Sequence, residues 1–266
     1  MNHIAESKGI VLFTKDYKEK DKLVKIFTES AGKLMFFVKG AHRKNNPLTP
    51  AIMPYTQAIY LGKFNQEGLS FLNAAKDIQP FLKIQQDIFP AAYATYLLAL
   101  TDAAIEDRVY DPNLFTFLQQ ALNLLDEGKD FEIVTNIFEI QILQRFGVLF
   151  NWEQCQICGQ TQGKFDFSPK YHGLLCERHF FEDKNRYQAN PIAIHFIRQF
   201  SQISYQNIQS ICLKEETKKQ IQKVIDQLYE EYVGIHLKSK KFIEQMNEWG
   251  NLLKPINENE ENGEKD

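Results

Sequence analysis

Three cysteines and a histidine between residues 155 and 179 constrain the fold of this chain more than any other feature. Two residues separate Cys155 from Cys158 and Cys176 from His179, and seventeen residues lie between the two pairs. This spacing is typical of a zinc ribbon, in which each tight turn presents two ligands to one Zn²⁺ ion. His172 could replace His179 as the fourth ligand. Because four protein ligands leave no place for an activated water, we expect one structural Zn²⁺ ion.

The surroundings of this motif also favour a small folded module. Gly159 and Gly173 stand beside the two pairs, where turns often need a positive φ angle. The alternating run from Lys164 to Phe167 predicts one strand of a hairpin. Cys212 lies far downstream without a partner, so we expect it to be a small buried apolar residue.

Length and composition indicate a globular cytosolic protein. The 266 residues allow one to three domains with a sizeable core. No run of eighteen apolar residues is present, and the first eight residues lack the apolar core of a signal peptide. We therefore expect no membrane contact and a cytosolic location, where a cysteine cluster binds metal more often than it forms disulfides.

Charge is distributed unevenly along the chain. Residues 1–80 carry twelve Lys or Arg against seven Asp or Glu, whereas residues 81–150 carry four against ten. This asymmetry suggests that different partners meet different domains, although uneven solvation of two surfaces would give the same pattern. Residues 257–266 are polar and strongly acidic, and we expect them to be disordered.

The N-terminal segment reads as strands. Five short runs rich in apolar and β-branched residues are separated by turn residues, at 9–14, 22–28, 32–40, 55–61 and 69–75. Five strands in about seventy residues predict a small closed barrel, of which the OB-fold is a common five-stranded form. An SH3-like barrel is the structural alternative.

The third run leads into a basic loop at residues 39–47. Lys39, Arg43 and Lys44 could hold a phosphate backbone there, or could only solvate the loop. Small barrels that bind single strands combine such a basic groove with aromatic side chains on which bases stack. Of the adjacent Phe36 and Phe37 only one can face outward, because successive residues of a strand point to opposite faces. The other aromatic residues of this region are Tyr55 and Tyr60.

From about residue 81 the apolar residues recur at helical spacing. We expect helices over 88–108, 112–125, 131–146, 191–200 and 214–235, and a last helix ending near Trp249. Asp111, Asp130 and Asn190 are suitable N-caps, two of them followed by Pro at the first helical position. Gly147 is a stop signal.

These assignments predict an α+β chain with five parts. Residues 1–80 form the barrel, and residues 81–150 and 189–256 form an all-helical domain in two parts. Residues 151–188 form an embedded zinc-ribbon-like module, and residues 257–266 form an acidic tail.

The motifs of common enzyme classes are absent. The chain has no P-loop, no Gly-x-Gly-x-x-Gly, no His-Glu-x-x-His and no Gly-x-Ser-x-Gly. A metal-dependent hydrolase would need an open metal position and a nearby general base. The sequence thus favours a binding protein. A zinc-ribbon adaptor that binds protein and has no direct role on DNA is the alternative to a nucleic-acid-binding protein.

Several short motifs, taken in order, resemble the RecO family of bacterial recombination mediators. In the N-terminal half they are Gly9-Ile-Val-Leu12, Tyr17-x-Glu19-x-Asp21-x-Leu23-Val24, Thr28, Gly32-Lys33 and Lys39-Gly40-Ala41-x-Arg43. Farther on they are Phe146-Gly147 before the first cysteine pair, Gly173-x-x-Cys176 before His179, and His236-Leu-Lys-Ser-Lys-Lys-Phe242. The resemblance covers nearly the whole chain except the acidic tail.

This resemblance implies a function in DNA repair without enzymatic activity. RecO-like proteins have an N-terminal OB-fold and a helical domain with an embedded zinc module. They bind single- and double-stranded DNA, anneal complementary strands, and act with RecR to load the RecA recombinase onto DNA covered by single-strand-binding protein. They work in the bacterial cytoplasm, at the nucleoid during repair. Many members have cysteine at all four metal positions, whereas this chain has His179 at the fourth.

The resemblance also implies contact residues. The DNA-backbone candidates are Lys33, Lys39, Arg43 and Lys44, with Lys238, Lys240 and Lys241 as a second group. The acidic, apolar tail of single-strand-binding protein would need a hydrophobic groove with a basic rim in the helical domain. Arg108, Arg198 or the 238–241 patch could supply that rim. The acidic C-terminal residues of this chain could compete for the same basic patches.

Overall fold

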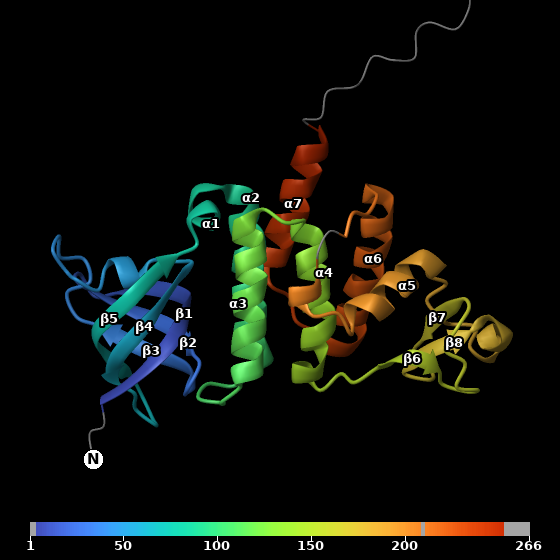
Figure 1. Cartoon of the computed structure of the whole chain (residues 1–266), viewed down its shortest axis with the longest axis horizontal. Helices are drawn as coiled ribbons and strands as arrows, with labels where there is room; N and C mark the ends of the chain where they lie inside the picture. Colours follow the sequence, from blue (N-terminus) through green and yellow to red (C-terminus); the bar gives the residue numbers. More distant parts are fainter. Residues whose placement is uncertain (1–3, 209–210, 253–266) are drawn as a thin grey trace, which may run out of the picture.

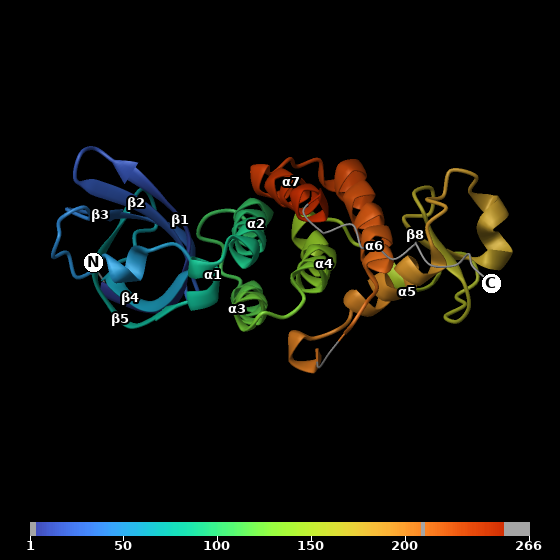
Figure 2. The same ribbon diagram turned by 90° about the horizontal axis from the view of Figure 1, so that it is seen from above.

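A computed structural model describes residues 4–208 and 211–252 of the chain. A barrel, a group of helices and a small three-stranded sheet follow one another along the long axis (Figures 1 and 2). The predicted α+β class is confirmed. Within the described ranges, no helix has both the length and the apolar content that crossing a membrane requires.

Five strands close the N-terminal barrel in the order β1-β2-β3-β5-β4. They are β1 (Ile4–Tyr17), β2 (Asp21–Thr28), β3 (Gly32–Val38), β4 (Thr56–Lys63) and β5 (Ser70–Pro80). β4 pairs back with β1, and only the β3–β5 pair is parallel. This is the Greek-key barrel of the OB type. Its interior is filled by fully buried side chains such as Val24, Ile26 and Phe36.

Among the described residues, seven α-helices follow the barrel, four of them before the small sheet and three after it. They are α1 (Leu82–Gln86), α2 (Ile88–Ala104), α3 (Pro112–Glu127), α4 (Phe131–Ile142), α5 (Pro191–Phe200), α6 (Glu215–Leu228) and α7 (Lys238–Leu252). The three predicted caps are in place, because Asp111, Asp130 and Asn190 accept backbone N–H bonds of 2.9, 3.1 and 2.9 Å.

Three helices end differently from the prediction. α2 stops at Ala104 because the next segment turns toward the barrel, where Arg108 N–H donates to the Lys33 carbonyl at 3.0 Å. α4 tightens into a 3₁₀ turn over Leu143–Phe146, and α6 widens into a π turn over Tyr229–Val233. The short helix α1 was not predicted, since five residues carry too little periodicity.

The cysteine-rich segment forms its own small sheet. β6 (Asn151–Cys155), β8 (Gly173–Cys176) and β7 (Phe165–Ser168) lie in that order, with β7 and β8 antiparallel. The strand expected over 164–167 is therefore present as half of a hairpin. The segment lies between α4 and α5 in sequence and packs against α5 (Figure 1).

Barrel and helices meet through one face of β2 and β3. Phe27 packs edge-to-face on Phe115 of α3, with ring centroids 5.6 Å apart. The Lys25 ammonium lies 2.7 Å from Asp102 and 2.9 Å from Asp107. At Gly32 (φ 68°) a Cβ atom would clash with the Val109 backbone, so only glycine permits this close approach.

Two further predictions concern the burial of Cys212 and the disorder of residues 257–266. Cys212 is exposed, so its predicted burial is wrong. The acidic segment 257–266 lies outside the described residues.

Candidate metal centre and nucleic-acid interface

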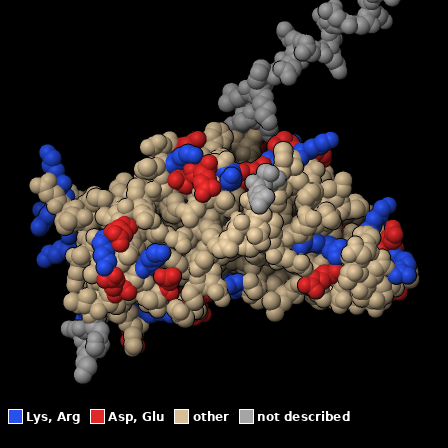
Figure 3. Space-filling view, in the orientation of Figure 1, with Lys and Arg blue, Asp and Glu red and all other residues tan. Residues whose placement is uncertain are grey.

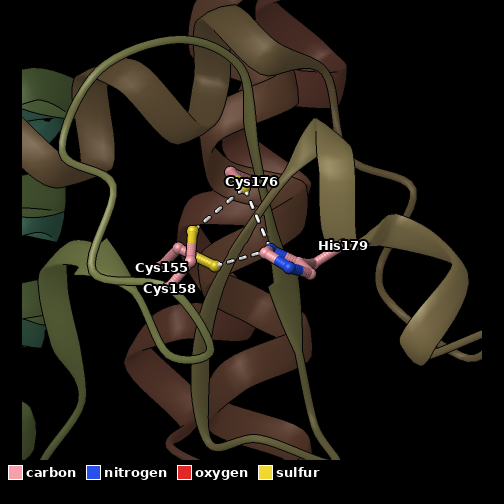
Figure 4. A group of neighbouring side chains, drawn as sticks. All are labelled: Cys155, Cys158, Cys176 and His179. Carbon is pink, nitrogen blue, oxygen red and sulfur yellow. Dashed lines mark hydrogen bonds between the residues drawn. The ribbon is translucent and has the colours of Figure 1, made fainter.

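The four predicted ligands converge on one point of the small sheet (Figure 4). Cys155 ends β6 and Cys176 ends β8. Cys158 lies in the turn after β6, and His179 lies in the 3₁₀ helix Glu177–Glu182 after β8. Their ligand atoms all lie within 4.8 Å of one another. His172 is not in this group, and its ring instead lies 6.0 Å from the ring of Tyr232.

The spacing of these atoms fits one tetrahedral ion. The Cys158 and Cys176 sulfurs are 3.8 Å apart. Nδ1 of His179 lies 3.6 Å from the Cys155 sulfur and 3.3 Å from the Cys176 sulfur. Zn–S bonds of about 2.3 Å and Zn–N bonds of about 2.0 Å at tetrahedral angles require separations of roughly 3.8 and 3.5 Å. The cluster can therefore hold a metal ion with His179 bound through Nδ1.

The turn around Cys155 prepares a thiolate. Burial alone would raise the pKa of Cys155, but backbone N–H groups of residues 176, 158 and 157 and the His179 ring lower the pKa to about 6. The Gly159 N–H donates to the Cys155 carbonyl at 2.9 Å and closes the turn. At neutral pH the ligand that a metal ion needs is then already deprotonated.

Arg198 of α5 anchors this turn to the helical domain. Its guanidinium donates to the carbonyls of Trp152 at 2.9 Å, Glu153 at 2.7 Å and Thr161 at 2.9 Å, and stacks 4.3 Å from the Phe165 ring centroid. Arg108 is similarly engaged, donating to the carbonyls of Asn65 and Gly68 in the barrel. Both guanidinium groups thus donate to backbone carbonyls of this chain.

The basic loop after β3 is exposed and internally braced. Gly40 N–H donates to the Asp21 carboxylate at 2.7 Å, and the Asn46 side-chain amide donates to the Gly40 carbonyl at 2.9 Å. Lys39, Arg43 and Lys44 project from this frame into solvent. No ion pair within the described ranges involves any of the three. Figure 3 shows Lys and Arg side chains gathered at this barrel end of the molecule.

Two other predicted contact residues are placed elsewhere. The Lys33 side chain is 2 % exposed, and its ammonium lies 2.8 Å from Asp102 and 3.6 Å from Asp107. Lys240 lies 2.7 Å from the buried Glu139 carboxylate and 3.2 Å from Asp226. Both charges are compensated inside the protein, so these two residues are removed from the DNA-contact set.

Lys238 and Lys241 of the second basic group are exposed at the start of α7. They line a cavity of about 420 Å³ whose apolar walls include Tyr96, Ile235 and Leu237. Four acidic residues also line this cavity, so the two exposed lysines lie at the edge of a hollow that is partly apolar and partly acidic: Glu139, Asp226, Glu230 and Glu244.

A row of exposed and half-buried side chains crosses the outer face of the barrel. Strand pairing places Lys15 opposite Leu23, Leu23 opposite Phe37, Phe37 opposite Phe71, and Phe71 opposite Lys63. Directly paired residues point to the same face of a sheet. We define the barrel row as these five residues together with Tyr17, which lies two positions beyond Lys15 and is 39 % exposed.

The barrel row changes which aromatic residues are available to a ligand. Phe36 and Tyr60 are fully buried, and the Tyr55 hydroxyl is bonded to Thr95 at 2.7 Å. Phe37 is the outward member of its adjacent pair and contacts the rings of Tyr17 and Phe71. Sequence reasoning missed Tyr17 and Phe71, and only the strand register could have revealed them.

Comparison with known proteins decides the family. A model of the RecO N-terminal region matches residues 1–81, and a model of the RecO C-terminal region matches residues 85–241. The chain belongs to the RecO family. It is similar to the DNA repair protein RecO of Enterococcus faecalis, with 67 % identity over 94 % of this chain and 96 % of the relative. The RecO of Streptococcus suis is 49 % identical over 96 % of this chain and 98 % of its own length.

The family assignment covers both candidate sites. The N-terminal match includes the basic loop and the barrel row, and the C-terminal match includes the four metal ligands and Lys238 to Lys241. The names of these RecO relatives specify DNA repair and no catalytic activity.

Proposed function

We propose that this chain is a non-enzymatic mediator of homologous recombination. It binds single- and double-stranded DNA, anneals complementary strands without ATP, and helps to load a recombinase onto DNA coated with single-strand-binding protein. The observation that carries this proposal is that Lys39, Arg43 and Lys44 are exposed and form no ion pair among the described residues, on an OB-type barrel in a chain of the RecO family. Its place of action is the bacterial cytoplasm, at the nucleoid during repair.

The loop supports annealing through charge. Lys39, Arg43 and Lys44 would contact phosphates of one strand, and neutralising that strand lowers the repulsion that a complementary strand experiences on approach. Contacts of this kind release counterions, so the affinity for DNA should fall steeply as salt is added. Because phosphates carry no sequence information, binding should be nearly independent of sequence.

The test is annealing of two labelled complementary oligonucleotides in the absence of nucleotide. We expect the wild type to accelerate annealing and Arg43→Glu/Lys44→Glu to lose most of this activity. Lys219→Glu/Lys223→Glu is the matched control, because both lysines are exposed on α6 and the net charge changes equally. Full activity of the loop variant, or equal loss in both variants, would contradict a DNA contact at this loop. A wild type that binds no DNA at low salt would leave the protein-adaptor function.

The metal centre contributes stability in this proposal. Cys155, Cys158, Cys176 and His179 would bind one Zn²⁺ ion, which the sulfur-rich tetrahedral set favours over harder cations. With all four positions filled, the ion would hold the small sheet together and activate no water.

Two protein partners complete the proposal. One is a RecR-like mediator, and the other is the acidic, apolar C-terminal tail of single-strand-binding protein. For the tail we propose the cavity beside Lys238 and Lys241, because Arg108 and Arg198 are already engaged. A labelled tail peptide should bind the wild type and bind Lys238→Glu/Lys241→Glu more weakly. Unchanged peptide affinity in that variant would place the tail elsewhere.

A further inference from the structure

The barrel row has the composition of a surface that binds unpaired bases. Between Lys15 on β1 and Lys63 on β4 it carries Leu23, Phe37 and Phe71. A third aromatic residue, Tyr17, lies beyond Lys15 on β1 and contacts the Phe37 ring. Tyr17 and Phe71 are 39 % and 42 % exposed. Phe13 of β1 is also 39 % exposed, so this side of the barrel holds several aromatic side chains in water. A group of exposed apolar side chains often marks a binding site.

The ring geometry leaves aromatic faces uncovered. The Tyr17 and Phe37 centroids are 6.0 Å apart at an interplanar angle of 88°, and those of Phe37 and Phe71 are 6.1 Å apart at 77°. In such edge-to-face pairs the rings do not stack on one another, so a third planar group can still lie against an exposed face. The Lys18 ammonium lies over one face of the Tyr17 ring, 5.4 Å from its centroid, so a base would use the other face of that ring.

The charge around the row suits a polyanion. No ion pair in residues 4–208 and 211–252 involves Lys15, Lys18 or Lys63. Two of the nearby carboxylates are already engaged, because Asp16 pairs with Lys22 and His42, and Asp21 accepts the Gly40 N–H. Glu19 lies in the turn between them and is exposed. The surplus around the rings is therefore positive.

We propose that the barrel row is a base-stacking subsite for single-stranded DNA, with Tyr17 and Phe71 as its main platforms. Bases of one strand lie on these rings while Lys15 and Lys63 contact the flanking phosphates. A duplex keeps its bases stacked inside and cannot use the rings, so the row gives the protein a preference for single strands. This inference rests on the proposed DNA binding and adds a second contact to the basic loop.

The subsite also fits annealing. Stacking on aromatic rings tolerates any base because every base has a π face, and it holds a strand with its bases separated from other strands. Rings that touch the bases only through their faces leave the hydrogen-bonding edges free to meet a complementary strand. Once the duplex forms, its bases no longer fit the rings and the product is released from the row.

The test compares three probes of equal length by fluorescence anisotropy at fixed salt. They are a thymine oligonucleotide, the same backbone with abasic sugars, and a duplex. Tyr17→Leu/Phe71→Leu keeps apolar contacts but removes the rings, and Phe181→Leu is the control, since Phe181 is 71 % exposed on the zinc-ribbon-like module. Circular dichroism and thermal melting check that each variant is folded.

We expect the wild type and Phe181→Leu to bind thymine at least about tenfold more tightly than the abasic strand, from the known strength of base–aromatic stacking. Tyr17→Leu/Phe71→Leu should lose this difference while its affinities for the abasic strand and the duplex stay unchanged. Equal binding of thymine and abasic strands by the wild type would overturn the stacking subsite and leave the basic loop intact. If the double variant keeps the thymine preference, the bases are held elsewhere. No binding of any probe would overturn the DNA-binding proposal itself, and this face would then remain for a protein partner.

Discussion

The first prediction is that the charge of Lys240 stabilises the fold, whereas the charge of its neighbour Lys241 does not. Its ammonium lies 2.7 Å from a Glu139 carboxylate that is only 1 % exposed, and Asp226 lies 3.2 Å away. Burial alone would lower the pKa of Lys240, but these two carboxylates raise the pKa above the usual value. We therefore expect Lys240→Met to destabilise the protein and Lys241→Met to leave its stability nearly unchanged.

The size of the stability loss follows from leaving the buried Glu139 carboxylate without its ammonium partner. Removing one partner of a buried ion pair costs about 3 to 5 kcal/mol. The lower end applies here, because the Tyr96 hydroxyl still donates to Glu139 at 2.7 Å and the Lys240 side chain is 19 % exposed. A loss of about 3 kcal/mol lowers the melting temperature of a chain of this size by roughly 6–12 °C.

Calorimetric or circular-dichroism melting of Lys240→Met and Lys241→Met measures this difference. The double variant Glu139→Gln/Lys240→Met should recover much of the lost stability, since it leaves no unpaired buried charge and Asp226 is 47 % exposed. If Lys240→Met and Lys241→Met melt within about 2 °C of each other, the reasoning is refuted. A difference of about 2 °C is close to the precision of the measurement.

Three further predictions concern the metal centre and the domain contact. Dialysis against a strong chelator should remove one metal ion per chain and make residues 151–188 sensitive to protease. The variant Cys158→Ser should bind no ion, whereas Cys212→Ser should bind one ion as the wild type does. Mass spectrometry measures the bound metal and the protease fragments. Arg198→Lys should lose metal to a chromogenic chelator about tenfold more readily than the wild type, because supporting groups hold the ligands in place, while Arg178→Lys should not. Burial alone would raise the pKa of Asp102, but Lys25 and Lys33 lower it, so its contribution to stability is present near neutral pH and is lost as the pH falls through this lowered value. The stability difference between wild type and Asp102→Asn should therefore shrink below about pH 4 in urea titrations.

The parts of the fold that sequence predicted are those fixed by local chemistry. Asp111, Asp130 and Asn190 mark helix starts because a side-chain oxygen can reach an N–H two or three residues away. The metal ligands were found because a two-residue gap is a property of one turn. The choice between His172 and His179 was not local. His172 has a φ of 49° in the turn between β7 and β8, and its ring lies near Tyr232 instead.

The barrel row was hidden by a single irregularity. Strict alternation from the buried Val11 would put Phe13, Lys15 and Tyr17 inside the barrel. A bulge between Val11 and Phe13 shifts the register against β2, so that Val11 pairs with Ile26 and Phe13 pairs with Lys25. Phe13, Lys15 and Tyr17 are thereby turned outward, and the residues between them take the other face. No residue type in this stretch announces the bulge, so sequence could not have placed Tyr17 on the surface.

Residues 1–80 are basic and residues 81–150 are acidic, and composition alone could not tell whether these charges meet each other or external partners. Part of the acidity of residues 81–150 faces the basic barrel directly, because Asp102 and Asp107 neutralise Lys25 and Lys33. These pairs attach the end of β2 and β3 that carries Phe27 to the helices. The opposite end of the same strands, which carries Leu23 and Phe37, stays open. Part of the barrel's remaining positive charge lies at this open end. It belongs to Lys15 of the barrel row and to the basic loop, which the bond from Gly40 N–H to Asp21 joins to the start of β2.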